Sequence, residues 1–354
     1  MILDSLVIDP TAFEARTGWV IKPQGACKGD VCVPLGNDAR NADGLLNAEV
    51  VAARLGMPIV ADGIHGVWAL GPESGLTGRA LTTAVAPDLE LPDLNGVPFR
   101  LSSLRGHKVV LVCWASWCGC REDLSLWQAL RQELHPKGLE VVTVALDTGG
   151  AEAARPWITK AQPQHPALID ATHVVDERLG VVNVPNAVWI DGDGMIVRPA
   201  EPAWLLEVKQ LDELHRAQLP PDHAAVFELV EQFNIDATKY PAMLRDWVEN
   251  GSASRFVLSP ADVIANSQPR STDGALAAAH FELGQHAQAA GDHAAAVAHW
   301  KDAHRLQPDN WTYKRQAWNL EAPDSVARID AYDTGWLEEV RKHGPQNYYP
   351  RLPA

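Results

Sequence analysis

The chain has 354 residues, of which 46% are hydrophobic and 21% charged, proportions typical of a folded globular protein rather than a disordered one. Its formal net charge of −15 repels nucleic-acid phosphates and anionic lipids, which argues against either as the main partner. No apolar run approaches the roughly 18 residues of a spanning helix. Because Met1–Ser5 also lacks the basic start and apolar core of a secretory signal, we expect a cytoplasmic protein with no membrane partner.

Residues 1–85 carry few periodic patterns. Apart from a helical pattern over 48–55, this N-terminal accessory region has short apolar runs separated by glycines, and the sequence does not assign its fold. Cys27 and Cys32 lie here on either side of Gly29, in what we interpret as a flexible loop. Three interpretations of this pair stay open: two unlinked thiols, a second dithiol that exchanges with another pair in the chain, or two metal ligands.

Between residues 86 and 202, strand patterns alternate with helix patterns. Continuous apolar runs at 108–114 and 139–146 are typical of strands buried on both faces of a sheet. The other predicted elements are short strands at 88–92, 97–101, 166–169, 184–190 and 195–198, and helices ending near 134 and covering 151–161. The alternation predicts an α/β sandwich, in which helices flank a mixed central sheet, as one domain over 86–202.

After residue 202 the chain changes to helical patterns with polar connections, predicted over 204–217, 223–233, 242–249 and 276–306. We expect a helical domain over 203–321 and a partly helical tail over 322–354. Within 275–308, the spacing of one tetratricopeptide unit is matched by Leu283-Gly284, Ala296, Trp300 and Pro308, with Gly291-Asp292 at the turn. An amphipathic helical hairpin without repeat ancestry is the alternative.

Cys118 is the residue best placed for chemistry. It follows a predicted buried strand and begins a predicted helix, where unpaired N–H groups and the helix dipole stabilise a thiolate. Arg121 adds positive charge near this position, whereas Glu122 and Asp123 oppose it. A thiolate is the form that attacks a disulfide, so Cys118 is predicted to be a nucleophile.

Cys120, two residues along, is the predicted resolving thiol. Side chains at i and i+2 diverge on a regular helix, so a Cys118–Cys120 bond needs a local departure of the backbone, which we expect Gly119 to allow. Such a bond should be strained and therefore readily reduced. Cys113, inside the predicted strand, is expected to be an inert core residue.

Three stretches, Ala86–Asp88, Leu101–Gly106 and Trp114–Cys118, resemble the ResA/TlpA-like branch of the thioredoxin superfamily. That branch usually separates its two cysteines by two residues, whereas only Gly119 separates them here. The Trp-Ala-x-x-Cys-Gly-Cys form resembles a subgroup in which selenocysteine takes the first position, so Cys118 would be the sulfur version of that nucleophile. The resemblance covers roughly a third of the chain and implies a thioredoxin-like fold and a thiol redox role.

The resemblance also assigns roles around the thiols. Thioredoxin-like proteins place a cis-proline beside the nucleophile, and Pro185 stands at the matching position. The backbone of Val184 would then be exposed and bind an extended substrate by strand addition. Trp114 and Trp117 are expected to form packing walls around the thiols. A trans proline at a strand edge is the alternative for the Val184–Pro185 bond.

Together these features predict a thiol–disulfide oxidoreductase with no bound cofactor and no metal. Its predicted partners are protein or small-molecule disulfide substrates, a thiol electron donor, and a protein that docks on the helical C-terminal region. The donor is either external or the Cys27/Cys32 pair. A thiol peroxidase is the nearest alternative, although the proline and threonine of peroxiredoxins are absent before Cys118. A scaffold with an inactive redox domain, or with zinc held by Cys27, Cys32, Cys118 and Cys120, is the alternative from another class.

Overall fold

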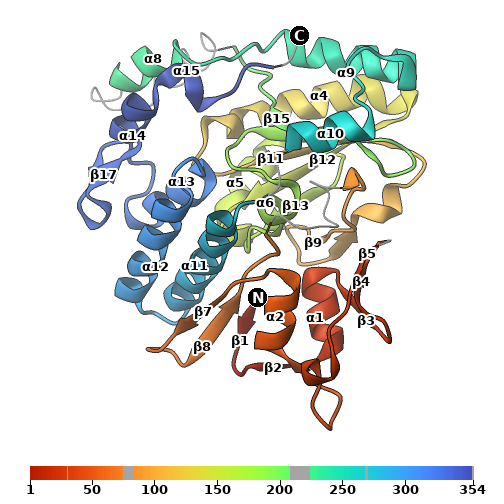
Figure 1. The fold of residues 1–354 in the computed structure, drawn as a ribbon. Coiled ribbons are helices and arrows are strands. Elements are labelled where there is room, and N and C mark those ends of the chain that lie inside the picture. The colour runs from red at the N-terminus through yellow and green to blue at the C-terminus, as the bar shows by residue number, and fades with distance from the viewer. Residues whose placement is uncertain (30, 75–82, 208–223, 268–269, 353–354) are drawn as a thin grey trace. The chain divides into compact units, whose positions relative to one another are not determined.

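The computed structural model describes residues 1–29, 31–74, 83–207, 224–267 and 270–352 (Figure 1). The chain divides into two compact units. One contains Met1–Thr83 with Gln268–Tyr313, and the other contains Ala84–Ser267 with Lys314–Ala354. The boundary at Thr83 lies near the expected one at residue 85, but the segment expected to form one helical domain, 203–321, is divided between the two units.

The second unit is built on a five-stranded sheet in the order β13-β12-β11-β14-β15. Its strands are β11 (Lys108–Trp114), β12 (Leu139–Leu146), β13 (Ala167–Asp170), β14 (Asn186–Ile190) and β15 (Ile196–Pro202). The first three are mutually parallel, whereas β14 is antiparallel to β11 and to β15. This mixed sheet with flanking helices is a thioredoxin-like sandwich, and the predicted bounds of β11 and β12 are confirmed.

Helices α4 (Leu124–Leu134) and α9 (Lys239–Asn250) lie side by side over one face of this sheet (Figure 1). Every second residue of the strands points to this face, and the apolar ones pack against the two helices in one core. Within it the rings of Trp189 and Trp247 stack with centroids 4.8 Å apart. Aromatic stacking of this kind contributes about 1 kcal/mol beyond area burial. The sheet thereby holds β11, and the loop after it, on a rigid support.

The remaining elements of this unit surround the sheet. They are β9 (Glu90–Pro92), β10 (Pro98–Arg100), α5 (Gly150–Ala161), α6 (Val174–Leu179), α8 (Ala224–Val230), α10 (Pro260–Ser267), α14 (Trp336–His343), α15 (Pro345–Tyr348) and the short strands β16 (Arg328–Ile329) and β17 (Thr334–Gly335). Helix α6 was not predicted, because its six residues are too few for a periodic pattern. The partly helical tail over 322–354 is confirmed.

The helix predicted over 204–217 is wrong at its start. Residues 204–207 are not helical, and the carboxylate of Asp123 accepts hydrogen bonds from the backbone N–H groups of Leu205 and Leu206, both at 3.0 Å. A tertiary contact therefore fixes the backbone of this segment. Residues 208–217 of the prediction lie outside the described part of the chain.

The first unit contains three small sheets, with orders β1-β8-β7, β2-β6 and β3-β4-β5. Its N-terminal elements are β1 (Ile2–Leu3), β2 (Val7–Ile8), α1 (Pro10–Thr17), β3 (Val20–Lys22), β4 (Gly25–Lys28), β5 (Val31–Val33), β6 (Leu46–Asn47), α2 (Ala48–Leu55), β7 (Ile59–Asp62) and β8 (Val67–Leu70). Phe13 and Trp19 are fully buried in its core. The predicted helix over 48–55 is confirmed as α2.

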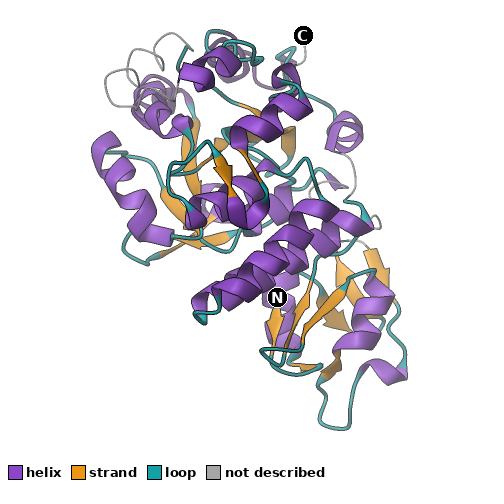
Figure 2. Ribbon diagram, turned by 90° about the vertical axis from the view of Figure 1, so that its left-hand side faces the viewer, coloured by secondary structure: helices purple, strands orange, loops and turns teal. Residues whose placement is uncertain are grey.

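Two long helices, α11 (Thr272–Ala289) and α12 (His293–Leu306), form a hairpin in this unit, alongside its strands (Figure 2). The turn falls at Gly291-Asp292 as predicted, and Asp292 caps α12 by accepting from the N–H of Ala295. A Cβ on Gly284 would lie 2.4 Å from the indole nitrogen of Trp300, so only glycine permits this approach of the helices. Helix α13 (Trp311–Glu321) follows.

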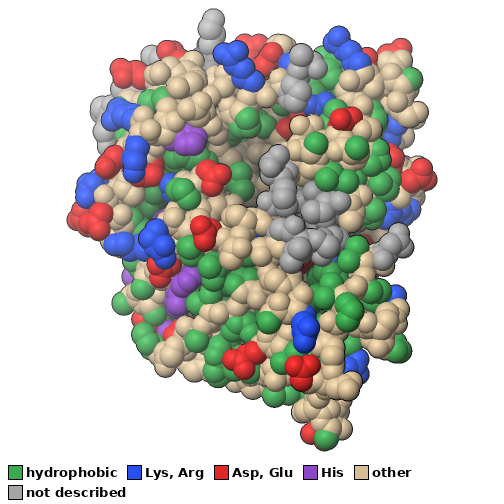
Figure 3. Space-filling view, in the orientation of Figure 1, with side chains coloured by type: hydrophobic (Ala, Val, Ile, Leu, Met, Phe, Trp, Pro, Cys, Tyr) green, Lys and Arg blue, Asp and Glu red, His purple; other side chains and the backbone are tan. Residues whose placement is uncertain are grey.

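Charge is mixed on the surface. On the face drawn in Figure 3, acidic and basic side chains are interspersed, and the basic ones there do not gather into one patch. Among the described residues, none of the helices combines the length and the apolar character that crossing a bilayer requires.

Candidate active site

Cys118 lies directly before a 3₁₀ turn, Gly119–Asp123, that continues into α4. Its backbone is extended, with φ −103° and ψ 140°, and its sulfur accepts a hydrogen bond from the Cys120 N–H at 3.3 Å. The departure from regular helix that the two thiols need is therefore made at Cys118 itself. Gly119 was expected to supply it, but Gly119 lies inside the turn and has no positive φ.

Cys118 and Cys120 have opposite pKa shifts. Burial is the largest influence on both, because the side chains are only 6% and 1% exposed. For Cys118 this effect is outweighed by hydrogen bonds from the Cys120 thiol and N–H and by the charge of Arg315, so the pKa of the Cys118 thiol is lowered. The pKa of Cys120 is raised well above its usual value by burial and by the Cys118 sulfur. Cys118 is therefore the thiol that ionises first.

The loop before β14 lies against Cys118. The Val184–Pro185 peptide bond is cis, as the resemblance implies, and the Cys118 thiol lies 3.5 Å from the Val184 carbonyl oxygen, to which it donates. The backbone of Val184 was expected to be exposed for pairing with a substrate, but Val184 is only 1% exposed. Its N–H donates to Asn183 Oδ1 at 2.9 Å, and its carbonyl also accepts from the Tyr349 hydroxyl at 2.8 Å.

Arg315, at the start of the second unit's C-terminal segment, is the cation that lowers the pKa of Cys118. It donates to the Trp117 carbonyl at 2.9 Å and lies over the Trp117 and Trp336 rings. Arg121, the expected cation, instead lies over the Trp157 ring and pairs with Asp324 at 3.2 Å. Arg315 was missed because 195 and more residues separate it from the motif, and no local pattern marks it.

A cavity of about 340 Å³ opens beside Cys118. Aromatic side chains dominate its wall, and Arg121, Arg315 and Asp324 supply its charges. The aromatic lining residues are Trp117, Trp204, Phe227, Phe233, Trp336, Tyr348 and Tyr349. Trp117 thus forms a wall of the site as expected, whereas Trp114 is buried at the end of β11 and does not line the cavity. The volume is at the lower end of the range for pockets that hold small organic ligands.

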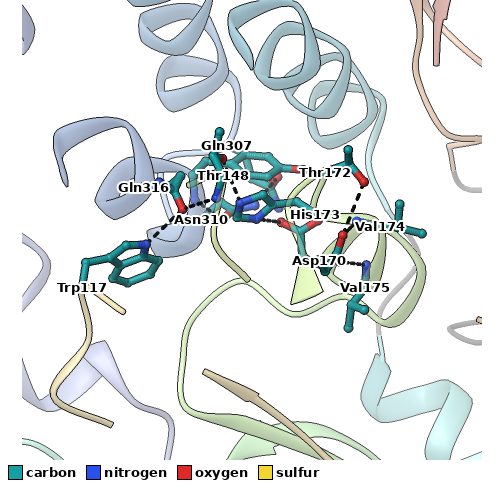
Figure 4. A network of polar contacts seen from close by, with 12 residues as sticks. Trp117, Thr148, Asp170, Thr172, His173, Val174, Val175, Gln307, Asn310 and Gln316 are labelled. Carbon is teal, nitrogen blue, oxygen red and sulfur yellow. Dashed lines mark hydrogen bonds and ion pairs between the residues drawn. The ribbon is translucent and has the colours of Figure 1, made fainter. Parts of the chain in front are cut away.

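A buried polar network supports Trp117 from behind (Figure 4). Gln316 Oε1 accepts from the Trp117 indole N–H at 3.1 Å and from the Thr148 backbone N–H at 3.0 Å. The Thr148 hydroxyl lies 3.4 Å from His173 Nε2. Asp170 accepts from the first N–H groups of α6, which holds the end of β13 in the same network. The network fixes the wall of the cavity to two loops at the same edge of the sheet.

Asp123 is a buried carboxyl next to the redox motif. It is 1% exposed, and burial raises its pKa to about 7 despite the hydrogen bonds from Leu205 and Leu206. Its charge raises the pKa of both Cys118 and Cys120. The sequence predicts that Asp123 and Glu122 disfavour the Cys118 thiolate, and Asp123 does so. Glu122 instead pairs with Lys160 at 2.7 Å.

The other cysteines lie elsewhere. Cys113 is fully buried in β11, and burial raises its pKa well above the usual value, in keeping with an inert core thiol. Cys27 and Cys32 belong to the other unit and are joined by a disulfide between the paired strands β4 and β5. They do not lie in the flexible loop that was expected. In this state neither sulfur is a free thiolate ligand for a metal.

Part of the chain is similar to known proteins. Residues 82–198 match the AhpC/TSA family. Thiol-disulfide oxidoreductase ResA of Bacillus thuringiensis is 27% identical over 115 residues, which are 32% of this chain and 65% of that protein. Thioredoxin-like protein YneN of Bacillus subtilis is 28% identical over 116 residues, 31% of this chain and 66% of its own length. The chain thus spans about two thirds of the length of these relatives.

Among solved structures, a putative thiol:disulfide interchange protein DsbE from Chlorobium tepidum is 26% identical. The match covers 37% of this chain and 91% of that one, with a TM-score of 0.31.

Proposed function

We propose that this chain is a thiol–disulfide oxidoreductase in which Cys118 is the nucleophile and Cys120 the resolving thiol. The observation that carries the proposal is the opposite direction of the two pKa shifts within one hydrogen-bonded pair. A low pKa makes Cys118 a thiolate that attacks, and a high pKa keeps Cys120 protonated until the first step is complete. The names of the relatives, thiol-disulfide oxidoreductases, support the same reaction.

The proposed reaction has two exchange steps. The Cys118 thiolate attacks one sulfur of a substrate disulfide, which forms a mixed disulfide and releases the first substrate thiolate. Cys120 then loses its proton and attacks Cys118 Sγ, so the second substrate thiolate leaves and a Cys118–Cys120 disulfide remains. The substrate is reduced by two electrons and the pair is oxidised by two. An external thiol donor restores the dithiol.

Trapping of the mixed disulfide tests this assignment. In a Cys120→Ser variant the first step is intact and the second is blocked, so the substrate should stay attached to Cys118 and be seen by mass spectrometry of the intact chain. In a Cys118→Ser variant no adduct should form. Equal adduct formation on Cys120 in the latter variant would contradict the assignment. Exposing the reduced chain to peroxide provides the comparison for a thiol peroxidase: oxidation no faster than that of free cysteine favours the exchange reaction.

The motif subgroup, the cellular location and the nature of the α11/α12 hairpin are part of the same proposal. The Cys-Gly-Cys spacing supports the subgroup that the sequence resembles, and a cytoplasmic location is proposed with it; fractionation of cells that express the tagged chain tests the location. We further propose that α11 and α12 form one tetratricopeptide-like unit. The close approach of Gly284 to Trp300 supports it, because small residues let such helices meet. A protein partner for this hairpin stays a prediction.

A further inference from the structure

The backbone edge beside Cys118 is already filled by the chain's own C-terminal segment. A carbonyl oxygen accepts two hydrogen bonds through its two lone pairs. Those of Val184 are taken by the Tyr349 hydroxyl at 2.8 Å and by the Cys118 thiol at 3.5 Å, while the Val184 N–H is bonded to Asn183. The Cys118 donation ends when the thiol ionises, but Tyr349 still occupies the Val184 carbonyl and Asn183 its N–H, so an extended peptide pairing here would have to displace both.

Tyr349 is held in place by several contacts. Its ring meets Trp204 and Phe233 edge to face, with centroids 5.7 Å and 5.5 Å apart. Its backbone carbonyl accepts from Asn234 Nδ2 at 3.1 Å, and the preceding Tyr348 carbonyl accepts from Asn183 Nδ2 at 2.9 Å. Both tyrosines are nearly inaccessible to solvent, at 2% and 4% exposure. The segment is thus a packed part of the site.

What remains open to the nucleophile is the aromatic cavity. Its rings favour a flat apolar group, which gains both area burial and ring stacking. Arg315 gives it one further property. Among the described residues no carboxylate lies within ion-pair distance of this guanidinium, which is packed over two indole rings, whereas Arg121 is paired with Asp324. The cavity therefore has a cation available to a ligand, close to the attacking sulfur.

We propose that the substrate of Cys118 is a small disulfide with an aromatic or other flat apolar body and a carboxylate, and that Arg315 selects the carboxylate. This rests on the proposed function, since it specifies the disulfide that the exchange reaction uses. Cys118 attacks the disulfide sulfur nearest to it, the carboxylated thiolate leaves, and Cys120 releases the second half; an external dithiol supplies the two electrons for the next cycle. Tyr349 disfavours polypeptide substrates because it occupies the Val184 carbonyl, with which their main chain would pair.

Three disulfides test the proposal on the reduced full-length chain. Dithiobis(nitrobenzoate) is aromatic and carboxylated, dithiodipyridine is aromatic and uncharged, and insulin carries its disulfides on polypeptide. Each rate constant is divided by that of dithiothreitol with the same disulfide, which removes differences between leaving groups. We expect the normalised rate to fall in the order given. A higher normalised rate with insulin than with dithiobis(nitrobenzoate) would overturn the proposal.

Arg315→Gln isolates the role of the charge. Loss of Arg315 also weakens the stabilisation of the Cys118 thiolate, which slows all three reactions alike, so the informative quantity is the ratio between the two aromatic disulfides. We expect the preference for dithiobis(nitrobenzoate) over dithiodipyridine to fall roughly tenfold, the effect of one charge-assisted contact. Arg341→Gln, an exposed position on α14, is the matched control and should leave the ratio unchanged. An unchanged ratio in Arg315→Gln would reject the assignment.

Tyr349→Ala tests the filled edge separately. It should raise the normalised insulin rate relative to that of dithiodipyridine by severalfold; no gain in the folded variant would remove the role given to Tyr349. If Tyr349→Ala does not fold, the wild-type order of rates and the Arg315 ratio still decide the proposal. The proposed function fails in a different way: wild type would then react with none of the three disulfides faster than the Cys118→Ser variant does.

Discussion

The two units each hold a pair of neighbouring cysteines, and the pairs differ in backbone setting. Cys27 and Cys32 face each other across antiparallel strands, where a regular ladder brings their Cα atoms to 4.1 Å and a disulfide joins them. Cys118 and Cys120 lie two residues apart where a strand loop turns into a helix, and both are free thiols. One pair links two strands, whereas the other has unequal pKa values and a cavity beside it.

Cysteine spacing alone therefore does not distinguish a disulfide-linked pair from a pair of free thiols with unequal pKa values. The surroundings separate them: a neighbouring guanidinium, hydrogen-bond donors aimed at one sulfur, and space for a substrate. These surroundings come from residues distant in the sequence, Arg315 above all.

Serine substitutions give the largest expected contrast between the pairs. Cys118→Ser should lower the single-turnover rate of disulfide exchange at least ~10³-fold, because the nucleophile is lost. Cys27→Ser combined with Cys32→Ser should leave that rate unchanged, as measured by release of the coloured thiolate from dithiobis(nitrobenzoate). A large fall in single-turnover rate in the double variant would show that the first pair takes part in the chemical step.

Asp123→Asn should change the pH dependence of stability. Because burial raises the pKa of this carboxyl from 3.8 to about 7, the folded chain binds the proton more tightly than the unfolded chain does. The stability that it contributes is present below about pH 4 and is lost as the pH rises to about 7, by roughly 4 kcal/mol. The Asn variant should lack this loss in urea unfolding at a series of pH values.

Asp193→Asn, at an exposed position in the turn between β14 and β15, is the control for that series. It should follow the wild-type curve. If the free energy of unfolding of Asp123→Asn and of wild type changed with pH in the same way, the assignment of the proton to Asp123 would be contradicted.

Removal of the Cys27–Cys32 disulfide should destabilise the chain moderately. The cross-link closes a short loop, with a sequence separation of 5, and restricting so short a loop in the unfolded chain contributes about 2 kcal/mol. The Cys27→Ser, Cys32→Ser double variant should therefore unfold at lower urea, followed by circular dichroism. Cys118→Ser combined with Cys120→Ser removes no cross-link and serves for comparison. An equal loss in both would show that side-chain packing, and not the cross-link, is responsible.

Gln316→Ala should destabilise the chain to an extent similar to loss of the disulfide. It leaves the Trp117 indole N–H and the Thr148 N–H without their acceptor, which costs about 1–3 kcal/mol for a buried donor. We expect a lower unfolding temperature and a changed tryptophan fluorescence spectrum. Gln346→Ala, at an exposed position, should change neither. An unaltered unfolding temperature in Gln316→Ala would mean that water replaces the lost acceptor.

The order of elements in the redox domain was predictable because its signals are local. Continuous apolar runs predicted the bounds of β11 and β12, and the short strand patterns at 88–92 and 97–101 placed β9 and β10 to within a few residues. An error arose at residues 204–207, which are not helical and where Leu205 and Leu206 donate to the distant Asp123. The first unit was unassigned because strands of two to four residues carry too little pattern.

For the site, local sequence patterns identified the two thiols and the α/β frame, since each depends on neighbours along the chain, and the family resemblance implied the proline beside the thiols. Only the tertiary structure decided what surrounds Cys118: Arg315 as the neighbouring cation, Tyr349 on the Val184 carbonyl, and the aromatic cavity. The physical reason is that electrostatic and hydrogen-bond effects depend on distance in space. Arg315 and Tyr349 are distant from Cys118 in the sequence, and no periodic sequence pattern marks such contacts.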